Sequence, residues 1–376
     1  MLIQNGLIHD AIHEAPYAAD LSIQNGKITA IAPHLTPAAG EQVIDAAGKH
    51  VWPGLVDAHC HIGLDNFGNG SMGKDYNEKT SVTTPELHGI DSFWPQDPGV
   101  RVALESGVTT ICTGPGSSNV IGGTFVAIKT YGTCADDMAI KKDCAMKCAF
   151  GENPKNSYSG KGSTVRMGVA ARLRDVLFAA REYMEKKEAG TGQKFDPKLE
   201  AMIPVLKKQI PLKAHAHRAD DICTAIRIAK EFDVDLTIEH CTDGALIVKE
   251  LKEAGYPVAI GPLLASFGKT ELANKSPATA GILSKAGVAV SICTDAPVVL
   301  PQFLATSAGV CVRYGMEPFA ALQAITINAA KHAGVADRVG SLEVGKDGDV
   351  VLTDGDILLN TTRILTVIVN GEKVVG

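Results

Sequence analysis

From about residue 51 to residue 340, short apolar runs of five to eight residues alternate with helix-like stretches. This alternation is typical of strand–helix units and predicts an α/β fold built on a parallel sheet. We expect eight strands, near residues 54–61, 107–113, 123–129, 144–151, 211–216, 234–239, 256–261 and 288–294. We expect helices at 98–106, 165–188, 219–231, 244–254, 277–286, 302–313 and 317–333.

Both ends of the chain have a different, β-rich texture. Asn5-Gly6 and Asn25-Gly26 stand between alternating apolar stretches near the amino terminus, and Asn370-Gly371 does the same near the carboxyl terminus. Asn-Gly pairs in this setting predict two-residue hairpins. Since chain ends often lie close together, we expect residues 1–50 and 341–376 to form one small β-domain around an inserted body, residues 51–340.

Composition and charge narrow the class of protein. Hydrophobic residues make up 45% and charged residues 21%, as in soluble globular proteins. The net charge is -6 and no Lys/Arg cluster is dense enough to follow a phosphate backbone, so nucleic acid is not an expected partner. The start MLIQNGLIHD lacks the regions of a secretory signal, and no apolar run reaches the ~20 residues that span a bilayer. We therefore predict a cytoplasmic protein with no membrane partner.

Ligand-type side chains stand at the ends of several expected strands. In VDAHCHIG, His59 and His61 are two residues apart, so on a strand they point to the same face and can reach one metal ion. His215 in PLKAHAH, His240 in DLTIEH and Asp295 in AVSICTD close later apolar runs. The carboxyl ends of parallel barrel strands converge on one face, so these side chains predict a metal centre there. The nine cysteines contain no CxxC pair and are expected to be mostly buried thiols.

The β-rich amino terminus, VDAHCHIG, IEH and the late TDAP together resemble the amidohydrolase superfamily of metal-dependent hydrolases, over nearly the whole chain. The HAH and IEH segments are most similar to its imidazolonepropionase-like and prolidase-like branch. The resemblance implies a (β/α)8 TIM barrel beside a small β-sandwich formed by both termini. It also implies that His215, the first histidine of HAH, is the metal ligand of that segment.

The family further implies a ligand on the fourth strand, either a glutamate or a lysine carboxylated by carbon dioxide. The segment CAMKCAFGENP offers Glu152 and Lys147 for these two roles. We prefer Glu152, because it stands at the strand end before an Asn-Pro turn and because GEN-P is similar to the glutamate-bearing segment of adenine deaminase-like members. Lys147 lies deeper in the strand and is the alternative.

Other polar residues near the expected mouth of the barrel are candidates for binding a substrate. His217 and Arg218 follow the ligand strand and could hold a substrate or an oxyanion, although Arg218 could equally pair with the aspartates beside it in solvent. His88 lies in residues 63–97, a segment rich in Gly, Asn, Asp and Pro that we interpret as a candidate lid. Residues 151–163 are expected to form another wall.

The ligand types predict a hydrolase that cleaves a carbon–nitrogen bond in a small molecule, such as an amide, a cyclic amide or a dipeptide-like amide. We expect one or two divalent ions, with zinc preferred over iron, manganese or nickel, and a metal-bound hydroxide as the nucleophile. Asp295 is the expected general base and then general acid. Two alternatives stay open: a deaminase of a heterocyclic base, and a non-catalytic relative of the fold. The substrate and the oligomeric state, including a homo-oligomer, are also open.

Overall fold

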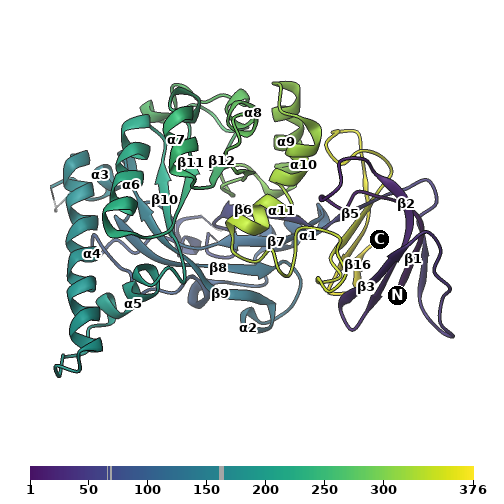
Figure 1. Cartoon of the computed structure of the whole chain (residues 1–376), viewed down its shortest axis with the longest axis horizontal. Coiled ribbons are helices and arrows are strands. Elements are labelled where there is room, and N and C mark those ends of the chain that lie inside the picture. Colours follow the sequence, from purple (N-terminus) through teal and green to yellow (C-terminus); the bar gives the residue numbers. More distant parts are fainter. Residues whose placement is uncertain (66, 68–69, 161–164) are drawn as a thin grey trace.

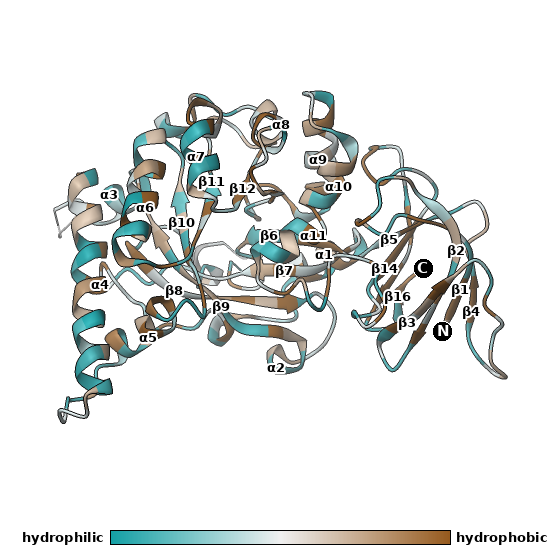
Figure 2. Ribbon diagram, viewed as in Figure 1, coloured by the Kyte–Doolittle hydropathy of each residue, from teal (hydrophilic) through white to brown (hydrophobic). Residues whose placement is uncertain are grey.

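Two eight-stranded sheets organise the computed structural model, which describes residues 1–65, 67, 70–160 and 165–376. One sheet forms a barrel with helices around it, and the other lies at its side and contains both chain ends (Figure 1). Figure 2 shows hydrophobic stretches along the barrel strands with hydrophilic positions between them, whereas α4 (Arg166–Glu188) on the outside is largely hydrophilic. The apolar residues of the strands therefore form the core that holds the site.

The barrel sheet follows the chain in order from β6 to β13. Its strands are β6 (Leu55–Cys60), β7 (Val108–Thr113), β8 (Ile121–Lys129), β9 (Ala139–Ala149), β10 (Leu212–Ala216), β11 (Leu236–His240), β12 (Val258–Ile260) and β13 (Val290–Ile292). Just beyond β13 the backbone N–H of Asp295 donates to the carbonyl of His59, at 3.0 Å. This bond joins the last strand to the first, so the barrel is nearly closed.

One strand departs from the predicted parallel order. β8 runs antiparallel to both β7 and β9, while the other neighbouring strands pair in parallel. No helix lies between β7 and β8 to carry the chain back across the sheet. The expectation that all eight strands run in parallel is therefore wrong at β8.

The helices agree well with the predicted spans. The expected helices appear as α1 (Pro98–Glu105), α4 (Arg166–Glu188), α6 (Ala219–Phe232), α7 (Val248–Ala254), α8 (Ala278–Lys285), α9 (Leu304–Arg313), α10 (Pro318–Ala324) and α11 (Ile327–His332). The single helix expected over 317–333 is thus two helices. The structure adds α2 (Ala135–Met138), α3 (Glu152–Ser157) and α5 (Pro197–Leu206).

The second sheet combines strands from both ends of the chain. Its order is β16-β15-β14-β5-β1-β2-β3, with β4 paired to β1. These strands are β1 (Leu2–Ile8), β2 (Tyr17–Gln24), β3 (Lys27–Ala32), β4 (Val43–Asp45), β5 (His50–Pro53), β14 (Val350–Thr353), β15 (Ile364–Val369) and β16 (Glu372–Val375). The termini do come together, whereas the division into a β-sandwich and a barrel domain at residues 50 and 341 stays a prediction.

Two of the three predicted hairpins are present. Asn25-Gly26 joins β2 to β3 and Asn370-Gly371 joins β15 to β16, with positive φ at all four residues. Asn5-Gly6 instead lies inside β1, at a shift of register against β2. The hairpin predicted there is wrong.

Within the described ranges, we find no helix with both the length and the apolarity needed to cross a bilayer. The cytoplasmic location stays a prediction.

Candidate metal centre

The structure gathers five of the six predicted ligand residues, all but Glu152, at the carboxyl ends of four barrel strands. The ring of His59, on β6, has its centroid 5.2 Å from that of His61 and 5.3 Å from that of His240. The rings of His215 and His240, on β10 and β11, are 4.4 Å apart. Asp295 Oδ1 lies 3.3 Å from His61 Nε2 and 3.6 Å from His59 Nε2. All five side chains therefore surround one small volume.

Backbone carbonyls fix the orientation of two of these rings. His61 Nδ1 donates to the carbonyl of Gly114 at 2.8 Å, and His240 Nδ1 donates to that of Gly261 at 2.7 Å. A carbonyl only accepts, so Nδ1 carries the proton and Nε2 keeps its lone pair. In metal-binding histidines, a carbonyl that accepts from one ring nitrogen commonly orients the other nitrogen toward the metal in this way.

Two of the predicted ligands have an unusual backbone. His240 has φ 73° and Asp295 has φ 54°, in the left-handed region that residues other than glycine seldom adopt. Such conformations persist where the surrounding structure holds them, and they concentrate at functional sites. Here they turn each side chain at the end of its strand toward the other ligands.

Burial favours the neutral form of His59, His215 and His240. It lowers the pKa of His240 to about 4 and the pKa values of His59 and His215 well below the usual value. Neutral imidazoles are the form that binds a metal. Burial raises the pKa of Asp295, but His240 and His61 outweigh this effect, so that the net pKa is lowered and the carboxylate stays ionised.

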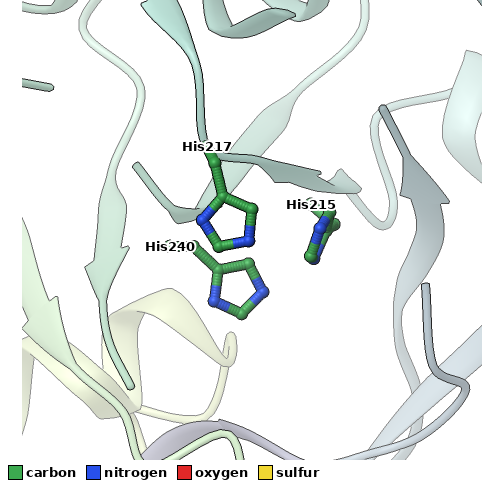
Figure 3. A group of neighbouring side chains, drawn as sticks. All are labelled: His215, His217 and His240. Atoms are coloured by element: carbon green, nitrogen blue, oxygen red, sulfur yellow. The ribbon is translucent and has the colours of Figure 1, made fainter. Parts of the chain in front are cut away.

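His217 lies with the ligands rather than at the rim. Possible ligand atoms of His215, His217 and His240 lie within 4.8 Å of one another, and the three rings face a common space (Figure 3). The possible ligand atoms of a second group, His59, His240 and Asp295, also lie within 4.8 Å of one another. The residue predicted to bind substrate is thus placed beside two predicted metal ligands.

The two candidates for the fourth-strand ligand have different surroundings. Lys147 is fully buried on β9, with Nζ 3.3 Å from His59 Nε2, and burial lowers its pKa to about 8. Glu152, at the start of α3, instead accepts a 3.0 Å hydrogen bond from the backbone N–H of Glu271. Within the described residues, no hydrogen bond or ion pair joins Glu152 to the histidines.

The other predicted substrate residues lie outside the cluster. Arg218 is partly exposed and forms an ion pair with Asp220 at 2.9 Å, the solvated alternative. His88 is nearly half exposed and its Nδ1 lies 2.8 Å from Asp143 Oδ1. It lines a neighbouring pocket of about 290 Å³.

A buried ionic network beneath the histidines was not predicted from the sequence. Glu239 is fully buried, with Lys213 at 3.1 Å, His332 at 2.8 Å and His59 Nδ1 at 3.4 Å. Burial raises the pKa of Glu239, but His332 and Lys213 outweigh it and the net pKa is lowered. Lysines within apolar strands, as in PLKAH and CAMKC, are the signal that could have indicated this network.

A pocket of about 480 Å³ leads to the cluster and includes His61, His215 and Asp295 in its wall. The segment 63–97 covers one side, where Tyr76 stacks on His61 with ring centroids 5.2 Å apart. Residues 66, 68 and 69 of that segment and 161–164 of the other predicted wall lie outside the described residues. The remaining wall comes from several loops and α3: Asp65, Lys74, Asn77, Lys79, Gly116, Ser117, Ser118, Asn153, Asn156, Ser157, Lys269, Pro297 and Val298.

Comparison with known proteins identifies the family. The model of the amidohydrolase family matches residues 50–374. The chain belongs to this family. The predicted membership is confirmed, and with it a relationship to hydrolases that act on carbon–nitrogen bonds.

Individual relatives agree with this assignment. The crystal structure of an amidohydrolase from Thermotoga maritima MSB8 is 38% identical, has a TM-score of 0.96 and matches over 99% of both chains. The imidazolonepropionase of Thermoplasma volcanium is 27% identical over 90% of this chain and 84% of its own length. Amidohydrolase tasK from Hapsidospora irregularis is 27% identical over 91% of this chain. The match spans only 38% of the length of tasK.

Proposed function

We propose that this protein is a metal-dependent hydrolase that cleaves a carbon–nitrogen bond of a small molecule, such as an amide, a cyclic amide or a dipeptide-like amide. The convergence of four histidines, Asp295 and Lys147 beside one pocket carries the proposal. The names of the relatives, amidohydrolase and imidazolonepropionase, support the type of bond.

The donor set fits a divalent cation. Imidazole nitrogen and carboxylate oxygen bind zinc as well as iron, manganese and nickel, and we propose zinc, as one or two ions. His59, His61 and Asp295 would hold one ion, and His215 and His240 the other. A bound ion supplies a water of lowered pKa and polarises the substrate oxygen.

Asp295 would move the proton in the reaction. Its ionised carboxylate lies next to the proposed ligands His61 and His59. It would accept a proton from the attacking water and then deliver it to the departing nitrogen, as a general base followed by a general acid.

For the fourth-strand ligand we propose Lys147 rather than Glu152. The buried Nζ lies beside His59, whereas the carboxylate of Glu152 is bonded to the backbone of Glu271. The neutral amine of Lys147 would attack carbon dioxide, forming the N–C bond of a carbamate and releasing one proton to solvent. The carbamate would offer two anionic oxygens in place of a buried amine.

The test is a screen of metal-reconstituted protein against hydantoins, imidazolones, lactams, N-acyl amino acids and dipeptides, with mass spectrometry of the products. We expect hydrolysis of one class, and its loss in His59→Ala and Asp295→Ala. His9→Gln, in the segment after β1 of the terminal sheet, is the control that should retain turnover. Full turnover in both site variants would rule out the proposed centre.

A deaminase is the second candidate. Adenine deaminase 2 of Rhizobium meliloti is 23% identical to this chain over 386 residues, which span 56% of that protein. Ammonia release from a panel of purines, pyrimidines and pterins, without cleavage of amides, would favour this candidate. A non-catalytic relative is less well supported, because both groups of metal donors are retained in the described residues.

A further inference from the structure

Glu271 is a buried carboxylate with one unused oxygen beside the cluster of three histidines. It lies in the short helical turn Thr270–Leu272, and its side chain is 1% exposed. Its Oε2 accepts a hydrogen bond from the backbone N–H of Glu152 at 2.9 Å. Its Oε1 has no hydrogen-bond partner within the described residues. This oxygen lies 3.9 Å from His215 Nε2 and 3.8 Å from His217 Nε2.

The nearby cations form long ion pairs with Glu271 and no hydrogen bond to it. Lys269 Nζ is 3.7 Å from Oε1, and Arg166 Nη2 is 3.8 Å from Oε2. Both separations exceed the ~2.7–3.2 Å of a hydrogen bond. A buried charge is costly unless it is closely paired or bound to a metal. Oε1 therefore has a cation only at 3.7 Å and no hydrogen bond within the described residues, so a closer positive partner would stabilise its charge.

His217 is oriented to share that partner. Its Nδ1 lies 2.8 Å from Thr242 Oγ1, which leaves Nε2 as the nitrogen near Glu271. His217 also belongs to the group, with His215 and His240, whose possible ligand atoms lie within 4.8 Å of one another. The ligands of a tetrahedral zinc ion are roughly 3.3 Å apart, given bonds of about 2.0–2.2 Å. The separations of 3.8 and 3.9 Å from Glu271 to the two nitrogens need only a small contraction around an ion.

We propose that His217 and Glu271 complete, with His215 and His240, a four-ligand site for a divalent cation. The proposal rests on the proposed function, because this site is the second metal position of the same centre.

The test measures metal binding rather than turnover. We titrate the metal-free wild type with Zn²⁺ against a chromophoric chelator, and do the same with its Glu271→Gln and His217→Asn variants. We then measure the number of zinc ions that each protein retains after gel filtration. We expect the wild type to bind two zinc ions, and each variant to bind one of them at least about tenfold more weakly. His240→Asn should weaken the same ion and His61→Asn the other. The absorption spectrum of the Co²⁺-loaded protein should change in the Glu271→Gln variant.

Two controls separate this role from a structural one. Glu200→Gln removes a hydrogen-bonded carboxylate on α5 and should leave both zinc affinities unchanged. Lys269→Met should also retain them, since the ion and not Lys269 pairs with Glu271. If Glu271→Gln does not fold, as judged by circular dichroism, Glu271→Asp serves in its place.

Wild-type zinc affinity in both His217→Asn and the Glu271 variant would overturn the proposal. An equal loss of zinc affinity in Lys269→Met would also overturn it. So would a wild-type protein that binds a single zinc ion whose affinity falls in His61→Asn and not in His240→Asn. None of these outcomes depends on finding a substrate, so failure of the hydrolase proposal would be recognised separately.

Discussion

At the scale of single residues, Asp295 and Lys147 each combine a charge-bearing side chain with surroundings that cost free energy. Asp295 has left-handed backbone geometry and an ionised carboxylate beside two histidines. Lys147 is fully buried and contacts His59. Both arrangements are costly for an isolated side chain, and a metal centre would offset their cost.

We predict that Asp295→Asn lowers kcat by about 10²–10⁴-fold, because the amide cannot accept and return a proton. The measurement is steady-state kinetics on the substrate found in the screen. His13→Gln, whose ring is exposed and contacts Asp10, should match the wild type. An Asp295→Asn variant with unchanged kcat would show that another group transfers the proton.

We predict that Lys147→Ala loses most activity and regains part of it in the presence of a short carboxylic acid such as acetate. The acid would occupy the space left by the side chain and replace the oxygens of the carbamate. Lys142→Ala, on the same strand but exposed and paired with Asp136, should show neither effect. Loss of activity that no carboxylic acid restores, in a folded protein, would argue against the carbamate.

At the scale of elements, the segment 63–97 is fastened to the barrel by the residue that begins the next helix. Asp97 caps α1 by accepting from the backbone N–H of Gly99 at 2.8 Å. Its carboxylate also accepts from the backbone N–H of Gly63 at 2.8 Å and of Phe67 at 3.1 Å. One carboxylate thus holds both ends of the segment that covers the pocket.

We predict that Asp97→Ala lowers the free energy of unfolding by at least about 1–2 kcal/mol and raises KM. Denaturant unfolding and steady-state kinetics measure the two effects. Asp196→Ala removes the corresponding cap of α5, which accepts from the backbone N–H of Lys198 and Leu199. It should lower stability similarly and leave KM unchanged. Equal KM values for the two variants would mean that the segment does not shape the pocket.

At the scale of the whole molecule, a buried ionic cluster joins the barrel to the terminal sheet. Lys129, at the end of β8, pairs with Asp349 and lies 3.0 Å from Asp347. Asp347 also binds Lys27 of the terminal sheet at 2.5 Å and Arg338 at 2.8 Å. Asp349 immediately precedes β14. The cluster therefore fixes the carboxyl-terminal strands against the barrel.

We predict that Lys129→Met lowers the free energy of unfolding by about 3–5 kcal/mol, because two buried carboxylates lose a partner. Lys186→Ala breaks an exposed pair with Glu182 and should cost less than about 1 kcal/mol. Chemical denaturation of both variants tests the comparison. A similar small cost for both would show that solvent replaces Lys129.

The sequence by itself determined the strand–helix alternation and the positions of the ligand-type residues. Both are local properties: apolar runs mark the strands, and His59, His215 and His240 stand where those runs end. The direction of β8 was not determined locally, because it depends on which strands it pairs with. Nor was the bulge at Gly6, where a Cβ would lie 2.5 Å from Val51 Cγ2 on a strand from farther along the chain.

Only the tertiary structure decided how deep each polar side chain lies and what it meets. Lys147 and Glu152 are five positions apart, yet one contacts His59 and the other bonds to the backbone of Glu271. Glu271 lies 3.8 Å from His217 although it comes from a helical turn 54 positions later in the chain. Such contacts join distant segments through the closure of the barrel, and no periodicity within a segment encodes them.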